Sequence, residues 1–143
     1  MPLVLGVDSS TQSTKAELRD LESGEVVAVG AAPHPATNPP VSEQDPEAWW
    51  QALLVAVEQL GEARSEVTAM AVAGQQHGLV LVDDAGAAVR PAKLWNDTTS
   101  ASSAAEMVEA LGPDAWARRC GSVPPVSYTH LRAHETQPVI SYA

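Results

Sequence analysis

Apolar and polar residues follow a strand-like pattern along the first part of the chain. Residues 3–8 form an apolar run of strand length, and residues 14–20 alternate between apolar and charged side chains. The turn-forming sequence Glu22-Ser23-Gly24-Glu25 then leads to a valine-rich run at residues 26–32. This order predicts a meander of three strands, in which the first two form a hairpin.

Helical periodicity begins after a proline-rich segment. Residues 33–41 contain four prolines, which predicts an extended connection because proline disrupts helices and central strands. Asp45 then precedes Pro46, an order typical of a helix N-cap followed by the first helical residue. Apolar residues continue one helix face up to Gly61, at Trp49, Leu53, Val57 and Leu60.

The rest of the pattern alternates between strands and helices. Residues 67–73 and 79–82 are apolar and predict two more strands, separated by the polar stretch Gly74-Gln75-Gln76-His77-Gly78. A helix starting at Thr98 or Ser100 is expected to reach Leu111, and residues 114–120 predict a short further helix. The pattern indicates an α/β domain in which helices flank a mixed sheet.

Composition restricts the class of protein further. A chain of 143 residues suits one domain, and its net charge of −10 argues against a nucleic-acid partner. The lone Cys120 cannot form an internal disulfide, and the N-terminus lacks the order of a signal peptide, so we expect a cytoplasmic protein. No apolar run approaches the roughly 20 residues of a membrane span, and no membrane partner is expected.

The stretch GVDSSTQSTK, residues 6–15, carries the first candidate chemistry. A carboxylate, Asp8, ends the first predicted strand, and hydroxyl residues crowd the next positions before Lys15. A carboxylate suits a hydrated divalent metal, while hydroxyl and backbone N–H groups donate to phosphate oxygens. The alternative is an ordinary turn in which Asp and Ser bond their own backbone. The glycine spacing excludes a Walker A loop and a dinucleotide fingerprint.

Two later motifs carry groups suited to a polyol. AGQQHG places Gln76 and His77 at a strand end, and their amide and imidazole groups match hydroxyls that both donate and accept. In LWND, Trp95 offers a flat apolar wall, and Asn96 and Asp97 offer directional polar contacts. The alternatives are a polar turn with an exposed His77, and an Asp97 that only caps the next helix.

Other aromatic and histidine residues are assigned to structure. We expect Trp49 and Trp50 to pack as part of a helix rather than stack on a ligand. His34 lies in the proline-rich segment and is expected to be solvent-exposed.

The motifs in their order resemble the N-terminal part of the xylulokinases in the FGGY carbohydrate kinase family. The matching stretches are GVDSSTQSTKAELRD, SEQDPEAWW and AGQQHGLVLVDDAGAAVRPAKLWND, and the resemblance covers about residues 3–123. It implies a ribonuclease-H-like fold of the actin and hexokinase type, of which this chain matches the beginning of the first domain. The activity it implies is transfer of the ATP γ-phosphoryl group to D-xylulose, giving D-xylulose 5-phosphate.

The resemblance also assigns roles to residues. Asp8 corresponds to an acid near Mg²⁺ and the phosphates of ATP, so ATP and Mg²⁺ are the implied cofactors. The phosphate-facing turn corresponds to Ser10, Thr11, Ser13 and Thr14, with Lys15 beside it. The sugar-side residues correspond to Gln76, His77, Trp95 and Asp97. The family's catalytic base is an aspartate much further along, so we expect these 143 residues alone to be inactive.

The end of the chain departs from the family pattern. After Val123 the sequence contains SYTHLRAHET, which looks like translated cloning sequence. We therefore expect a partial kinase domain at residues 1–123 and an artefactual or disordered tail at residues 124–143. His130 and His134 are spaced like metal ligands, but their place in this tail argues against a metal site.

Two alternative functions stay open at this point. One is another FGGY kinase, acting on gluconate, glycerol or ribulose. The other is a non-catalytic half-domain that binds a sugar or a nucleotide. The expected partners are small molecules, D-xylulose and ATP, and a homodimeric parent enzyme is an option that the sequence leaves open.

Overall fold

The computed structural model describes residues 2–124. Residues 125–143, including His130 and His134, lie outside the described residues. The chain divides into two compact units, which are described separately. Within the described residues, the sheet unit consists of residues 2–36, 44–76 and 80–91, and the helical unit of residues 37–43, 77–79 and 92–124.

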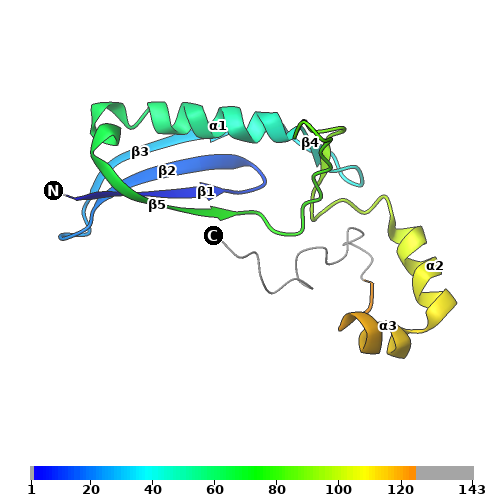
Figure 1. Ribbon diagram of the computed structural model, residues 1–143. Helices are drawn as coiled ribbons and strands as arrows, with labels where there is room; N and C mark the ends of the chain where they lie inside the picture. The colour runs from blue at the N-terminus through cyan, green and yellow to red at the C-terminus, as the bar shows by residue number, and fades with distance from the viewer. Residues whose placement is uncertain (1, 125–143) are drawn as a thin grey trace. The chain divides into compact units, whose positions relative to one another are not determined.

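A four-stranded mixed sheet forms the centre of the sheet unit (Figure 1). Its strands are β1 (Leu3–Ser9), β2 (Ser13–Asp20), β3 (Val26–Pro33) and β5 (Val67–Gly74). The strand order is β3-β2-β1-β5, with β1 antiparallel to β2 and parallel to β5. The predicted meander, the fourth of these strands and the mixed sheet are therefore confirmed.

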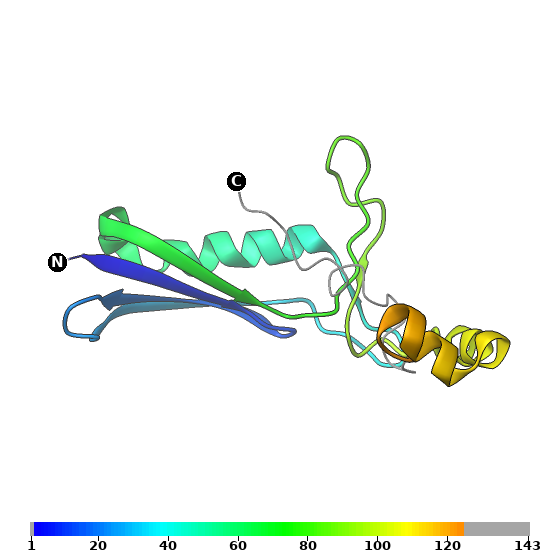
Figure 2. The ribbon, with the colours of Figure 1, turned by 60° about the horizontal axis from the view of Figure 1, so that its bottom comes forward.

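Helix α1 (Pro46–Glu58) packs on β2 and β3, along one side of the sheet (Figure 2). The helix begins as predicted, because the Asp45 side chain accepts a hydrogen bond of 2.9 Å from the backbone N–H of Glu47, and Pro46 takes the first turn. Alternating residues of β1 and β2 point toward the helix and are buried. The core comprises Leu3, Leu5, Val7, Ala16, Leu18, Ala56 and Leu60.

Two contacts set how closely α1 approaches the edge strand β3. A Cβ added to Gly30 would lie 1.9 Å from the backbone oxygen of Ala56, so only glycine fits at this position. Gln59, at the end of α1, bonds both backbone groups of Ala31, with distances of 3.0 Å from Oε1 to N and 3.0 Å from Nε2 to O. Gln59 thus takes the place of a neighbouring strand at this point of β3.

The predicted strand at residues 79–82 is wrong. The short 3-10 helix η1 (Gly61–Glu66) and β5 precede this region, which holds only the isolated pairs Leu79–Lys93 and Val82–Ala88. Asp83 closes a tight turn by accepting hydrogen bonds from two following backbone N–H groups. Val80 to Val82 are exposed, and no continuous ladder of backbone pairs joins this region to a neighbouring strand.

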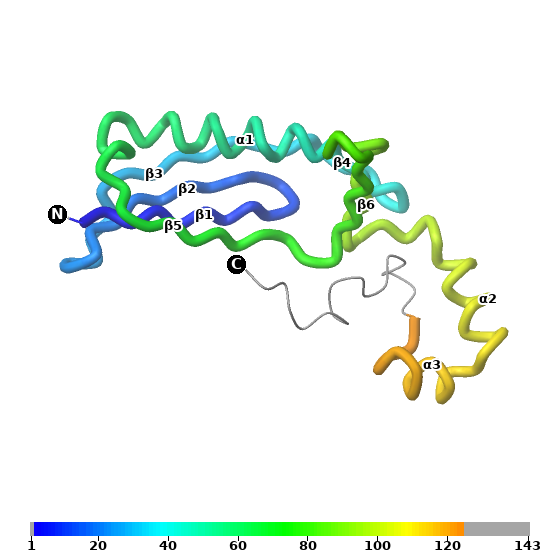
Figure 3. The backbone as a smooth tube through the Cα atoms, viewed as in Figure 1, coloured from blue at the N-terminus to red at the C-terminus, as the bar shows by residue number. Residues whose placement is uncertain are grey.

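A small two-stranded sheet precedes the two helices of the helical unit along the chain. Strand β4 (Glu43–Gln44) pairs with β6 (Ala92–Lys93), and α2 (Ala101–Leu111) and α3 (Pro113–Cys120) come next along the chain (Figure 3). Both helices agree with the sequence prediction, which is confirmed. No helix within residues 2–124 is long and apolar enough to cross a membrane.

Candidate functional site

The turn between β1 and β2 presents the first candidate site, and residues 9–14 are here called the hydroxyl loop. Asp8 lies next to the last residue of β1 and pairs across the hairpin with Lys15 of β2. Both the backbone N–H and the hydroxyl of Ser10 donate to the carbonyl oxygen of Ser13, at 3.0 and 3.1 Å. The predicted strand-end position of Asp8 and the hairpin turn are confirmed.

Asp8 and Lys15 face the same side of the sheet. Directly paired residues on antiparallel strands project to one face, and both side chains are exposed and line one pocket of about 490 Å³. Gly6, Ala71 and Ala73 also line the pocket, and their small size leaves the strand ends accessible. A carboxylate and an ammonium group therefore stand together beside the hydroxyl loop.

The charge arrangement around Asp8 suits Mg²⁺ together with a phosphate ligand. Within residues 2–124 no group of three or more His, Cys, Asp or Glu side chains could hold a metal ion. Mg²⁺ usually keeps several waters and is bound through one or two carboxylates and substrate phosphates. The single carboxylate of Asp8 is enough for this mode of binding.

Gln44 supports the hydroxyl loop from outside it. Its side chain is 3% exposed, and Nε2 donates to the carbonyl oxygens of Thr11 at 3.0 Å and of Pro35 at 2.5 Å. Its Oε1 accepts a hydrogen bond of 2.7 Å from the indole N–H of Trp49. Gln44 therefore joins the loop to the first turns of α1, a role that sequence reasoning missed. The one available signal was its place just before the N-cap Asp45.

Gln75 supports the loop from the end of β5. Its backbone N–H donates to the carbonyl oxygen of Ser9 at 2.9 Å, and its side-chain oxygen accepts from the hydroxyl of Thr11 at 3.2 Å. The first glutamine of the AGQQHG motif thus contacts the hydroxyl loop directly. Gln76 and His77, the two expected sugar contacts, follow it along the chain.

His34 also supports the loop, and the expectation that it is solvent-exposed is wrong. It is 7% exposed, its backbone N–H donates to the carbonyl oxygen of Gln12 at 2.8 Å, and its Nε2 lies 2.8 Å from the hydroxyl of Thr14. The proline-rich segment passes beside the hydroxyl loop, which no local pattern predicted. Thr14 is fully buried, with its hydroxyl 3.3 Å from that of Ser9, so its side chain is enclosed within the fold.

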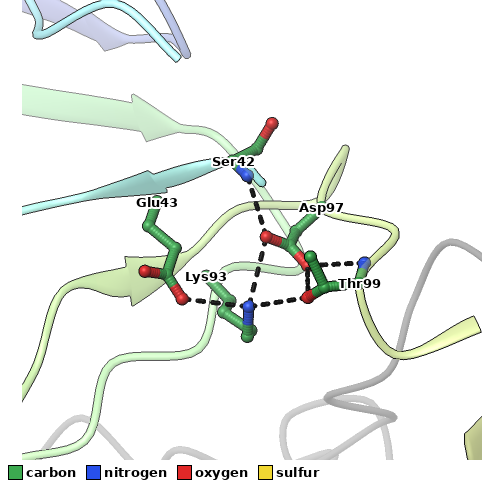
Figure 4. Close-up of polar contacts among 5 residues, drawn as sticks. All are labelled: Ser42, Glu43, Lys93, Asp97 and Thr99. Atoms are coloured by element: carbon green, nitrogen blue, oxygen red, sulfur yellow. Dashed lines mark hydrogen bonds and ion pairs between the residues drawn. The ribbon is translucent and has the colours of Figure 1, made fainter. Parts of the chain in front are cut away.

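A second polar cluster surrounds Asp97 in the helical unit (Figure 4). Asp97 is 2% exposed, and its carboxylate accepts hydrogen bonds from the backbone N–H of Ser42 at 2.8 Å and from both the hydroxyl and the backbone N–H of Thr99. The Lys93 ammonium lies 3.2 Å from Asp97, 2.9 Å from Glu43 and 2.9 Å from the Thr99 hydroxyl. The five residues form one connected network.

Both central groups of the network are charged at neutral pH. Burial favours the neutral form of Asp97, but hydrogen bonds from Thr99 and Ser42 and the Lys93 ammonium outweigh it and lower the pKa of Asp97 to about 2. Burial likewise opposes the charge of Lys93, but Glu43 and Asp97 raise its pKa above the ordinary value. Asp97 is thus an anchor that ties its own segment to the backbone at Ser42.

The anchored segment presents the residues just before Asp97 at or near the surface. Trp95 is 44% exposed, and Asn96 is half-buried with a buried Oδ1 that has no partner within residues 2–124. Asp97 follows β6 of the two-stranded sheet, whereas Gln76 follows β5. The two motifs therefore follow strands of different sheets.

His77 lies in the same unit as Asp97. Its backbone φ is 60°, the only positive value at a non-glycine residue within residues 2–124. Such a conformation is uncommon and clusters at functional sites. The backbone N–H of Leu79 donates to the carbonyl oxygen of Lys93 at 3.0 Å, so the short segment that begins at His77 is tied to β6. Gln76 belongs to the sheet unit and is exposed.

Comparison with known proteins identifies the family. Residues 3–131 match the N-terminal domain of the FGGY family of carbohydrate kinases. The chain is 50% identical over 144 residues to the xylulose kinase of Streptomyces rubiginosus, covering 96% of this chain and 30% of that protein. It is 54% identical over 129 residues to that of Streptomyces coelicolor, covering 90% of this chain and 27% of that protein.

A solved structure agrees with these matches. The xylulose kinase of Bifidobacterium adolescentis superposes with a TM-score of 0.78 at 42% identity, over 90% of this chain and 28% of that one. The predicted fold class, an incomplete domain of the ribonuclease-H-like type, is therefore confirmed. The chain belongs to the FGGY family of carbohydrate kinases, and its residues 3–131 match the N-terminal domain of that family.

Proposed function

We propose that this chain is the N-terminal part of an ATP-dependent xylulose kinase, which transfers the γ-phosphoryl group of ATP to D-xylulose and forms D-xylulose 5-phosphate. The two Streptomyces relatives carry the name xylulose kinase, and the chain spans 27–30% of their length. The observation that carries the proposal is the Asp8–Lys15 pair beside a hydroxyl loop that His34, Gln44 and Gln75 hold in place.

The ATP phosphates are assigned to the hydroxyl loop. Enzymatic phosphoryl transfer depends mainly on positioning and on electrostatic stabilisation of the phosphoryl oxygens. Hydroxyl and backbone N–H groups of the turn would donate to these oxygens, and Lys15 would add a positive charge. When bound, Mg²⁺ would be held by Asp8 with waters and phosphate oxygens, and it would neutralise phosphate charge. The proposed phosphate contacts are Ser10, Thr11, Ser13 and Lys15, with Thr14 in a supporting role.

The contacts to the sugar are assigned to Gln76 and His77 of the AGQQHG motif and to Trp95 of the LWND motif. Gln76 and His77 carry amide and imidazole groups that can donate to and accept from sugar hydroxyls. Trp95 is exposed enough to pack against the sugar face, as aromatic side chains do in carbohydrate sites. The carboxylate of Asp97 is already engaged, so we assign it the role of fixing the segment that carries Trp95.

The general base is assigned to a part of the enzyme outside these residues. The acceptor hydroxyl must lose a proton as it attacks phosphorus, and a positioned base typically contributes about 10²- to 10⁴-fold to the rate. The family resemblance places this base on an aspartate beyond the matched region. A complete kinase is therefore needed to test the activity.

A chimeric kinase tests the proposal directly. Residues 3–123 of this chain would replace the matching part of the Streptomyces coelicolor relative, and ADP release would be measured with D-xylulose, ribulose, glycerol and gluconate. We expect ADP release that depends on D-xylulose and exceeds that with the other three compounds. Activity on glycerol or gluconate without activity on D-xylulose would contradict the proposed substrate.

A further inference from the structure

The buried side chain of His34 lies under the hydroxyl loop and is bonded on one side only. Its Nε2 is 2.8 Å from the Thr14 hydroxyl, whereas its Nδ1 is buried and has no hydrogen-bond partner within residues 2–124. A neutral imidazole carries one N–H group and one acceptor nitrogen. The unequal surroundings of the two nitrogens therefore decide where the hydrogen lies.

The hydrogen belongs on Nε2. Buried N–H groups without an acceptor are rare, because such a group loses its bond to water without replacement. A bare acceptor nitrogen at Nδ1 is the less costly arrangement, so Nε2–H donates to the oxygen of Thr14. The single hydrogen of the Thr14 hydroxyl is then directed to the Ser9 hydroxyl, 3.3 Å away.

The chain of hydrogen bonds has a direction and ends at Ser9, the first residue of the hydroxyl loop. Ser9 follows Asp8, is half-buried, and accepts from Thr14 through its hydroxyl oxygen. Its backbone is held separately, since its carbonyl oxygen accepts from the backbone N–H of Gln75. The hydrogen of the Ser9 hydroxyl is thus left for another acceptor, at the entrance to the hydroxyl loop.

We propose that His34 is a positioning residue that, through Thr14, fixes the Ser9 hydroxyl as a hydrogen-bond donor to phosphate oxygens bound at the hydroxyl loop. This inference rests on the proposed function, which places nucleotide phosphates there. Phosphate oxygens only accept hydrogen bonds, so a hydroxyl with its hydrogen already directed outward suits them. An oriented donor also loses less rotational freedom on binding than a free hydroxyl.

A double-mutant cycle in the chimeric kinase tests this chain of hydrogen bonds from His34 through Thr14 to Ser9. Ser9→Ala removes its end, and Thr14→Val removes its middle without changing the side-chain shape. Each single variant is expected to raise the KM for ATP about three- to tenfold and to leave the KM for D-xylulose unchanged. In the Ser9→Ala background, Thr14→Val should change the KM for ATP by less than about twofold, because the two residues act as one unit.

Variants of His34 provide a second test with a matched control. Gln places an N–H donor near the position of Nε2, so His34→Gln should keep most of the ATP affinity, while His34→Leu should raise the KM for ATP like Thr14→Val. Thr14→Ser keeps the hydroxyl and should resemble the parent. The thermal midpoint of each variant shows whether it folds. If His34→Leu or Thr14→Val does not fold, ATP affinity is compared between the parent, His34→Gln and Thr14→Ser.

The outcomes separate this inference from the proposed function. Calorimetric binding of MgADP gives the same comparison between variants without turnover. A chimera that binds MgADP but does not phosphorylate D-xylulose would contradict only the proposed substrate, and the positioning role of His34 would still be tested by nucleotide binding. The positioning role is overturned if Thr14→Val weakens nucleotide binding equally with and without Ser9. It is also overturned if His34→Leu and His34→Gln bind nucleotide alike.

Discussion

At the scale of single residues, the aspartates of the two candidate clusters, Asp8 and Asp97, are held in opposite ways. Asp8 is exposed at a strand end beside Lys15, and its carboxylate lines an open pocket. Asp97 is buried, and backbone N–H groups, a hydroxyl and Lys93 engage both of its oxygens. The first arrangement suits contact with a ligand, and the second suits a fixed structural anchor.

Removal of the Asp8 charge is expected to affect turnover. In the chimeric kinase, Asp8→Asn keeps the shape of the side chain but loses the charge that would face Mg²⁺ and the phosphates. We expect kcat to fall about 10²- to 10³-fold, the range seen when one electrostatic contact of a transition state is removed. Steady-state kinetics would measure this, with Glu22→Gln in an exposed turn as the control. A kcat within twofold of the parent would contradict the role of Asp8.

The low pKa of Asp97 predicts a loss of stability in acid. The pKa is about 2 in the folded chain against an ordinary value of 3.8, so the carboxylate stabilises the fold above about pH 4 to 5. This contribution of about 2.5 kcal/mol is lost as the pH falls toward 2. Urea unfolding of the 143-residue chain, followed by tryptophan fluorescence from pH 6 to pH 2, measures the loss.

Asp97→Asn is the matching variant for this prediction. It should be less stable at pH 6, by about 2–4 kcal/mol, because Lys93 loses a partner and a buried N–H loses an acceptor. The difference between parent and variant should shrink as the pH falls, because protonation removes the same charge in the parent. A difference that stays constant from pH 6 to pH 2 would show that Asp97 does not stabilise the fold through its charge.

At the scale of elements, the contact between α1 and β3 decides how the sheet unit packs. Gly30 lets the helix backbone approach the strand, and Gln59 bonds the strand edge at Ala31. The same helix begins beside Gln44, which bonds the hydroxyl loop through the carbonyl oxygen of Thr11. The position of α1 therefore influences both the core and the candidate phosphate site.

Gly30→Ala is expected to destabilise the sheet unit. The added Cβ would lie 1.9 Å from the backbone oxygen of Ala56, so strand and helix must move apart. We expect a loss of about 1–3 kcal/mol, the usual cost of overpacking, which lowers the thermal midpoint by several degrees. Gly6→Ala is the control, because its Cβ would meet no atom closer than 4.0 Å. Equal midpoints for the two variants would contradict the close approach.

At the scale of the whole molecule, the described residues leave apolar surface uncovered. Strand β5 lies at one edge of the sheet, and its residues Met70 and Val72 are both 61% exposed. Val29 of β3 is 58% exposed. Unpaired strand edges and exposed apolar side chains favour association with other polypeptide segments. This surface accords with a chain that spans 27–30% of the length of its relatives.

The 143 residues alone are expected to show no kinase activity. They carry Asp8 and the hydroxyl loop, but the general base is assigned to another part of the enzyme. Loss of the base alone typically costs about 10²- to 10⁴-fold. Coupled ADP release by the purified chain with D-xylulose should equal the no-enzyme control, whereas the chimera should be active. Titration calorimetry with D-xylulose adds a separate result, since clear binding without turnover would support the sugar-binding half-domain.

Local sequence determined most of the elements and the place of the phosphate-side candidates. The alternation at residues 14–20 produced β2, and Asp45 with Pro46 started α1 where expected. These features depend on neighbouring residues only, because strand alternation, helix caps and turns are set within a few positions of the chain. For the same reason, the strand-end position of Asp8 follows from the apolar run that precedes it and the turn-forming residues that follow it.

Tertiary structure alone decided which distant residues support those candidates. His34 contacts Thr14 twenty residues away, and Asp97 bonds the backbone of Ser42 over a separation of 55 residues. Residues 79–82 failed as a strand because no continuous partner strand lies beside them and only isolated pairs form at Leu79 and Val82. Burial and pairing at these positions depend on how separate segments pack, and a pattern of neighbouring residues carries no information about that packing.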